Sequence, residues 1–167
     1  MRPNELSTLF EYSWWATEHL FTTAEALTPE QFAAPIHFPF GSIRATLAHI
    51  MAAQWVWRHR FIKGESPTSL YDFNEFQSRE ELLGAFHIER DRWRPFLASA
   101  TQEQLDAPIS WKNTRGDAAT KPLWLGLTHV VNHSTQHNSE IAQALTDFGH
   151  SPGNIDLIFW AIREGVE

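Results

Sequence analysis

Hydrophobic residues recur at steps of three and four along four long stretches of this chain, a spacing typical of helices that bury one face. In the first stretch Leu6, Phe10, Thr17, Leu20 and Leu27 lie on one side of such a helix. Turn-forming residues separate the stretches, so each is expected to form its own helix. The pattern predicts helices over residues 4–27, 43–61, 79–97 and 122–148, and a short fifth helix over 155–162 capped by Asn154.

Capping residues mark several of the expected helix ends. Thr28 and Ser78 each precede a helix, and Gln31 and Glu81 stand three positions later, where their side chains can complete a capping box. Gly149 follows the fourth stretch and is positioned as its C-terminal stop. These signals depend only on neighbours in the sequence, so they predict helix boundaries without any assumption about the fold.

An internal similarity indicates how the helices are connected. The segment Thr28–Ile36 matches Thr101–Ile109 at six of nine positions, and each copy lies between two long helices. The chain therefore reads as two halves, each a helix, a connector and a helix. The connectors exceed the usual length of a tight turn between neighbouring helices. The predicted fold is all-α, a four-helix bundle with long crossover connections and a short C-terminal fifth helix, in one domain spanning residues 1–167.

Charge and composition exclude several functional classes. The net charge is −7 with His neutral, and the basic residues form no continuous stripe that could neutralise phosphates, so no nucleic-acid partner is expected. No apolar run approaches the ~18 residues that span a membrane, and there is no cysteine to form disulfides or thiolate ligands. We therefore expect a cytoplasmic protein with a small-molecule substrate and no membrane partner.

The aromatic content, 8 Trp and 12 Phe, is high for a chain of this length. Aromatic side chains bury a large area each, so the core should be well filled. Trp14, Trp15, Trp55 and Trp57 are interpreted as core residues rather than as the wall of a pocket.

A histidine pair in the fourth helix indicates a metal site. His133 and His137 are four residues apart, which puts both imidazoles on one helical face, and they flank the apolar stripe that turns inward. Two ligands hold an ion poorly, and His49 is the best candidate for a third because it lies mid-helix in an apolar setting. Three histidines leave coordination positions open, as catalytic sites do. His129 is expected to lie next to the metal ligands without binding the metal, or at the surface.

Other metal motifs do not fit these residues. A zinc protease would have Glu directly after the first His of the pair, and Ser134 stands there. A di-iron bundle would need Glu three residues before a His on two helices, and none of the nine His has one. Glu140, three residues beyond His137, is a candidate catalytic carboxylate that could add a ligand, hold a water or relay protons. The remaining histidines occur singly and are expected at the surface or in caps: His19, His37, His59, His87 and His150.

Three segments in the expected order resemble the DinB-like (damage-inducible) superfamily. The stretch from His129 to His137, HVVNHSTQH, is similar to the last-helix signature of that family. Leu47–Ile50, LAHI, resembles its second-helix element, and Gly149–Ile158 resembles its closing segment. The resemblance spans nearly the whole chain. It implies a four-helix bundle, one divalent transition metal held by His49, His133 and His137, and frequent homodimerisation.

The chemistry that the resemblance implies is thiol transfer, because members with assigned reactions are transferases or isomerases that use bacillithiol or mycothiol. This chain departs from the family after the second metal histidine, where Arg-Gly-Gln is common and Asn138, Ser139 and Glu140 follow. The departure alters the charge beside the site and puts in doubt a substrate inferred from relatives.

Three functional hypotheses therefore stand. The first is metal-dependent transfer of a low-molecular-weight thiol to a small electrophile, as in detoxification. The second is metal-dependent hydrolysis of a small ester or amide, and the third is a non-catalytic metal-binding stress-response protein. Imidazole ligands suit zinc, nickel, copper and iron alike, so the ligand set does not select the metal.

Overall fold

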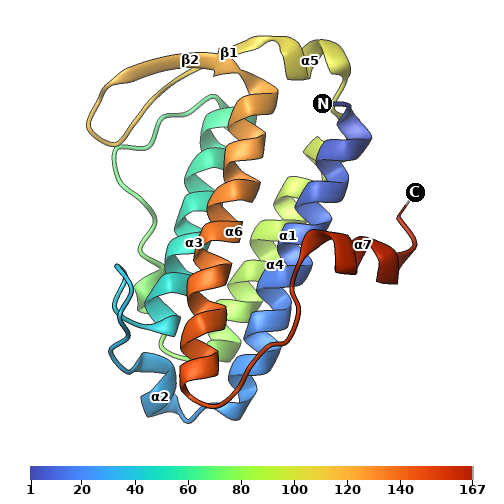
Figure 1. Cartoon of the computed structure of the whole chain (residues 1–167). Helices are drawn as coiled ribbons and strands as arrows, with labels where there is room; N and C mark the ends of the chain where they lie inside the picture. Colours follow the sequence, from blue (N-terminus) through green and yellow to red (C-terminus); the bar gives the residue numbers. More distant parts are fainter. Residues whose placement is uncertain (167) are drawn as a thin grey trace.

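The computed structural model describes residues 1–166, apart from the side chain of Asn74, and is mostly helical (Figure 1). The long helices are α1 (Pro3–Thr23), α3 (Ile43–Arg58), α4 (Arg79–Ser99) and α6 (Leu123–Asp147). The shorter elements are η1 (Ala24–Ala26), α2 (Pro29–Ala33), the π-helical η2 (His59–Lys63), η3 (Phe73–Glu75), α5 (Gln102–Asp106), β1 (Pro108–Lys112), β2 (Ala118–Pro122) and α7 (Leu157–Glu164).

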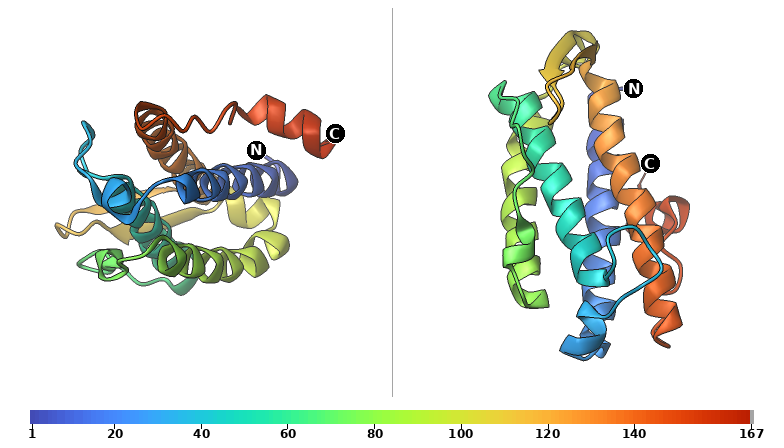
Figure 2. Two further views of the ribbon diagram at one scale, coloured as in Figure 1. Left: turned by 90° about the horizontal axis from the view of Figure 1, so that it is seen from below. Right: turned by 90° about the vertical axis from the view of Figure 1, so that its left-hand side faces the viewer.

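The four long helices form one bundle in which α1 and α3 each pack against both α4 and α6. Figures 1 and 2 show that α1 and α6 run in one direction and α3 and α4 in the other. The segment between η2 and α4 therefore returns along the length of the bundle. The connector with α2 closes one end, and α5 with the β1–β2 hairpin closes the other. The prediction of a four-helix bundle with long crossovers is confirmed.

Aromatic rings fill the centre of the bundle. Trp14 and Trp93 are almost wholly buried, and Phe10 contacts both rings, with centroid distances of 5.5 and 5.4 Å. Phe21 of α1 packs on Phe86 of α4 in the same core. Burial of such large side chains supplies much of the free energy that holds the four helices together.

The predicted caps are present. Thr28 and Ser78 accept hydrogen bonds from the backbone N–H groups of Gln31 and Glu81, and both capping boxes are complete. Thr101 forms the same box at the start of α5, so the two similar segments begin with the same local structure. That the chain consists of two repeated halves remains a prediction.

The structure differs from the expected elements at four points. The second helix, expected to reach residue 61, ends as an α-helix at Arg58 and continues as the π-helical η2. The stretch after α5 contains a two-stranded antiparallel hairpin that pairs Pro108 with Pro122 and turns at Gly116, whose φ of 93° is left-handed. The first helix becomes a 3-10 turn at Ala24. The last helix begins two residues later than predicted, with Asp156 at the N-cap, because the Asn154 side chain accepts a hydrogen bond from the Asp156 N–H instead.

A buried ion pair joins α3 to α4. Nε and one terminal nitrogen of Arg58 donate to the two carboxylate oxygens of Glu89, at 2.5 and 3.1 Å. Both residues are almost wholly buried, with 5% and 2% of their surface exposed. The two opposite charges of Arg58 and Glu89 thus neutralise each other in the core. None of the helices in the described part of the chain combines the length and hydrophobicity that a membrane span requires.

Two helical glycines should respond oppositely to alanine substitution. A Cβ at Gly126 would come within 2.3 Å of the buried Phe61 ring, whereas a Cβ at Gly84 would meet nothing within 4 Å. We expect Gly126→Ala to lower the free energy of unfolding by about 1–2 kcal/mol net of its helix propensity, and Gly84→Ala to raise it by about 0.5–1 kcal/mol. Urea unfolding of both variants measures this, and the same sign for both would contradict the close packing at Gly126.

Candidate metal centre

The three predicted histidines converge between α3 and α6. His49 lies in the middle of α3, and His133 and His137 lie one turn apart on α6. One ligand nitrogen from each lies within 4.8 Å of the other two, and Nε2 of His49 is 3.1 Å from Nε2 of His133. His137 is buried, and the other two are partly exposed. The packing of two antiparallel helices thus brings residues 84 positions apart in the sequence to one point.

Phe40 covers one side of the cluster. Its ring stacks on His49 with a centroid distance of 3.8 Å and meets His137 edge-on at 5.2 Å. The residue belongs to the loop before α3, where Gly41 has a left-handed φ of 79° and its carbonyl accepts a hydrogen bond from the Ile36 N–H. Sequence reasoning missed this contact, because nothing in the residues around Phe40 indicates which helix its ring will meet.

Glu140 orients the His137 ring. Its carboxylate lies 2.8 Å from Nδ1 of His137. A carboxylate at neutral pH can only accept, so Nδ1 carries the proton and donates, which leaves the Nε2 lone pair available for a metal. Metal-binding histidines commonly have such a carboxylate partner, which holds the ring and increases its basicity.

His49 and His133 stay uncharged at neutral pH. Burial, followed by the charge of His137, lowers the pKa of His49 to about 4. Burial and the three neighbouring histidines His137, His49 and His129 lower the pKa of His133 to about 3. Neutral imidazoles are the form that binds a metal ion.

These residues are compatible with one divalent metal ion. Three imidazole donors, one of them oriented by a carboxylate, would leave coordination positions of a bound ion open. A pocket of about 330 Å³ adjoins His49 and could admit a small molecule to the open side. Its lining comes from α3 and from the segment before α4: Phe40, Ala45, Ala48, His49, Ala52, Leu70, Tyr71, Asp72 and Phe73.

The other histidines lie outside the cluster. His129 is exposed, and its ring centroid is 5.7 Å from that of His133, in keeping with a surface position beside the site. His59 pairs with Glu65, and His87 pairs with Glu18, which are structural contacts. Of the tryptophans expected in the core, Trp14 is a core residue, whereas Trp57 contributes to the wall of a second pocket.

The family departure after His137 has a structural explanation. The Asn138 side chain is buried and exchanges hydrogen bonds with the Thr17 hydroxyl of α1 at 3.1 Å. The Ser139 hydroxyl donates to the Thr135 carbonyl, and Glu140 bonds His137. Asn138 therefore connects α6 to α1, and Glu140 holds the His137 ring against its own helix.

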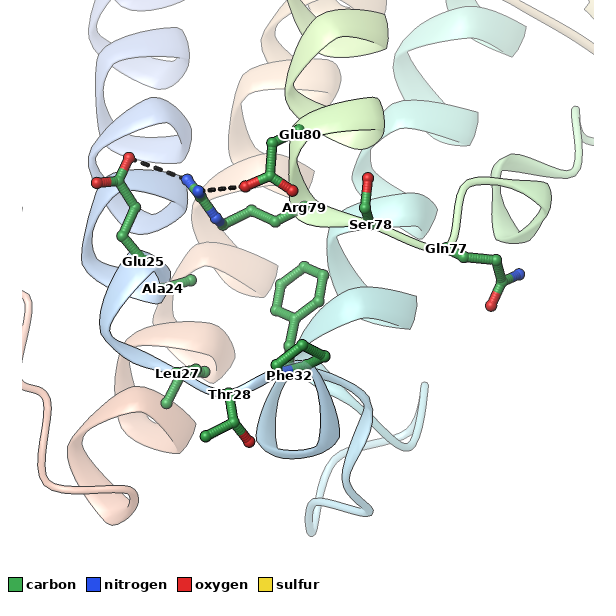
Figure 3. A pocket seen from close by; sticks show the side chains of 10 residues that line it. Ala24, Glu25, Leu27, Thr28, Phe32, Gln77, Ser78, Arg79 and Glu80 are labelled. Carbon is green, nitrogen blue, oxygen red and sulfur yellow. Dashed lines mark hydrogen bonds and ion pairs between the residues drawn. The ribbon is translucent and has the colours of Figure 1, made fainter.

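A further pocket, of about 220 Å³, lies between the end of α1, α2 and the start of α4. Figure 3 shows Arg79 at its edge, reaching toward Glu25 and Glu80. Its charged groups pair with one another, and none of the three clustered histidines lines it. The histidine cluster is therefore the better candidate for a functional site.

The fold and the cluster together define a four-helix-bundle protein with a three-histidine candidate metal site. The family model described as "DinB family" matches residues 1–164, so the chain belongs to the DinB family. It is similar to "Protein DinB" of Bacillus subtilis (strain 168), with 27% identity over 155 residues that cover 89% of this chain and 88% of that protein.

One solved structure shares the fold. Its description reads "YfiT from Bacillus subtilis is a probable metal-dependent hydrolase with an unusual four-helix bundle topology". The TM-score is 0.66 at 18% sequence identity, and the alignment covers 90% of this chain and 91% of that one. The likeness extends to the arrangement of the helices, and at this identity it concerns the fold alone.

The lowered pKa values predict an acid-sensitive apoprotein. The pKa of both His49 and His133 is near 6.5 in the unfolded chain, but about 4 and about 3 in the folded protein. Below pH 6.5 the unfolded state therefore binds more protons than the folded state, and the free energy of unfolding decreases as the pH is lowered. Each contributes at most about 1.4 kcal/mol per pH unit, less where water reaches the ring. Urea unfolding of chelator-treated protein at pH 7 and pH 5 measures the loss. His133→Asn should reduce it, and an unchanged loss in that variant would contradict the assignment.

Proposed function

We propose that this DinB-family protein is a metal-dependent enzyme that transfers a low-molecular-weight thiol to a small electrophile. The observation that carries the proposal is the convergence of three imidazoles beside a pocket of about 330 Å³. The pocket argues against a purely structural metal site, which would be closed. The chain contains no cysteine, so the thiol must be a separate molecule.

Each residue of the site has a defined task in this proposal. His49, His133 and His137 hold the ion, and Glu140 keeps the His137 ring in the orientation that its 2.8 Å hydrogen bond fixes. We infer a positioning role for Glu140 rather than the proton relay expected from sequence. A divalent ion at this site would act as a Lewis acid and lower the pKa of a coordinated thiol. Phe40 stacks on the His49 ring and, with the largely apolar wall of the pocket, would contact a bound substrate on that side.

The test is transfer of several small thiols to a chromogenic electrophile. The protein is assayed as purified, after chelation, after reloading with zinc or nickel, and as His137→Ala. We expect turnover that disappears on chelation, returns on reloading and is absent in the variant. Metal-independent turnover, or none across the panel with fully loaded protein, would overturn the proposal.

The second candidate is metal-dependent hydrolysis of a small ester or amide. The fold likeness to a structure described as a probable metal-dependent hydrolase favours it. The same protein samples, incubated with ester and amide substrates without any thiol, separate the two reactions. Product formation in the absence of thiol supports hydrolysis, and product that contains the thiol supports transfer.

The expected homodimer stays a prediction. Helix α7 lies on the outer side of α1 (Figure 2), and it carries the two most exposed large apolar side chains among residues 1–166, Ile162 and Ile158. Ile158, Phe159 and Ile162 are 63%, 55% and 71% exposed. Light scattering of the full chain and of Ile162→Glu tests whether this face joins two copies. We expect a dimer for the first and a monomer for the second.

A further inference from the structure

The His49 ring is held in a different way from the His137 ring. Nδ1 of His137 bonds the Glu140 carboxylate at 2.8 Å. In the described part of the chain, the one hydrogen-bond contact of the His49 side chain is that of its Nε2 with Nε2 of His133, at 3.1 Å. Both nitrogens of that contact are potential ligand atoms, so a bound ion would replace it. Metal-binding histidines normally have a second partner that fixes the ring, and for His49 that partner is not a hydrogen-bonding group of residues 1–166.

The Phe40 ring lies flat against His49. The two planes are inclined by 18°, and the centroid distance of 3.8 Å is shorter than the about 4.5–7 Å that is usual for aromatic pairs. The other rings in contact with His49 are those of His133 and His137, both at 4.9 Å, and these are candidate ligands themselves. Phe40 is thus the one ring among residues 1–166 that contacts His49 without being able to bind an ion. Rotation of the imidazole about its Cβ–Cγ bond would bring its edge into this ring.

The loop before α3 holds Phe40 in place without help from the histidine. The Ile36 N–H donates to the Gly41 carbonyl, and the Gly41 N–H donates to the Phe38 carbonyl, both at 2.9 Å. The next residue, Ser42, caps α3 through its hydroxyl. The Phe40 side chain is half-buried and does not belong to the hydrophobic core. The loop therefore sets the position of this ring, and its contact with the cluster is not a by-product of core packing.

We propose that Phe40 is a positioning residue of the metal centre, whose stacked ring holds the His49 imidazole with Nε2 facing the other two histidines of the cluster. The stack takes the place of the carboxylate that orients His137. A ligand that is already oriented loses less conformational freedom on binding, so the affinity for the ion increases. This role rests on the metal binding that the proposed function also requires, but not on thiol transfer or any other reaction.

A purely structural role for Phe40 makes a different prediction. Phe38 belongs to the same loop but packs against the hydrophobic core, and the ring contacts of this loop with the cluster are both made by Phe40. Phe38→Ala should therefore lower the midpoint of thermal unfolding of the metal-free protein more than Phe40→Ala does, and leave the metal affinity nearly unchanged. If Phe40 acted only by shaping the loop, Phe38→Ala would weaken metal binding as much as Phe40→Ala, and this result would overturn the proposal.

The experiment measures the affinity of the full chain for zinc and for copper(II) by competition with a chromogenic chelator. Phe40→Ala should bind roughly ten-fold more weakly, the lower end of the usual cost of removing the partner that orients a ligand. Phe40→Tyr keeps the flat ring and should bind as the unaltered protein does. Phe40→Leu keeps apolar bulk without the flat face and should be weakened. Equal affinity of Phe40→Ala and the unaltered protein would overturn the proposal and leave the proposed function intact.

A double-mutant cycle tests whether Phe40 acts through His49. In His49→Ala no ring is left for Phe40 to orient, so adding Phe40→Ala should not weaken the residual copper(II) affinity further. Copper(II) binds such sites more tightly than zinc, which keeps a two-histidine site measurable. Glu140→Gln is the matched control, because it acts on His137 and should weaken binding with or without His49. The same loss from Phe40→Ala in both backgrounds would mean that Phe40 acts elsewhere and would overturn the proposal.

Discussion

The His137→Ala variant should purify with almost no divalent metal, whereas the unaltered protein should carry roughly one equivalent per chain. His137 is the buried member of the cluster and the one that Glu140 orients, so its loss leaves two partly exposed imidazoles. Two neutral ligands without a fixed third donor hold an ion weakly. Element analysis of untagged protein after extensive dialysis measures the difference.

Two further variants define which contacts matter at the cluster. His129→Ala removes a histidine from the same helix, but one whose ring is not among the three that converge, so it should keep the metal. Glu140→Gln should weaken metal binding by roughly 10–100-fold, the usual cost of losing a ligand's orienting partner. Metal retained by His137→Ala, or lost equally from His129→Ala, would contradict the assignment of the ligands.

The largest expected loss of stability follows Glu89→Ala. The substitution leaves the Arg58 guanidinium buried between α3 and α4 without the carboxylate that now accepts two of its hydrogen bonds. Removing one partner of a buried pair typically costs about 3–5 kcal/mol. Urea unfolding should show this decrease in the free energy of unfolding, with a midpoint shifted to lower urea concentration.

An exposed pair provides the matched control. Glu11 bonds Arg94 between α1 and α4, and both side chains are 46% exposed, so Glu11→Ala should cost at most about 1 kcal/mol. Replacing both buried partners, as Arg58→Met with Glu89→Leu, should recover most of the loss because no charge is left unpaired. A cost for Glu89→Ala no larger than that for Glu11→Ala would show that Arg58 finds water or another acceptor.

Secondary structure was the most predictable part of this protein. The apolar stripes predicted the four long helices. Ser78 marked the start of α4, Gly149 the end of α6 and Thr28 the start of the short α2, because capping depends on residues three or four positions away. The hairpin after α5 was missed. Its strands are only five residues each and largely exposed, so their alternation is weak beside the helical signal.

The candidate site was predictable to the extent that it is local. The four-residue spacing of His133 and His137 puts both rings on one face of any helix. Assigning His49 as the third member required its apolar setting and the family resemblance, since no local rule links positions 84 residues apart. Phe40 was not identified from the sequence, because a loop phenylalanine carries no signal of which side chains it will contact.

Local sequence was thus sufficient for the helices, their caps and the histidine pair, since these depend on contacts within about one helical turn. The closure of the His49–His133–His137 cluster, the cover of Phe40 and the Arg58–Glu89 pair depend instead on which helices become neighbours. That choice comes from burial summed over the whole bundle, to which each residue contributes a small part.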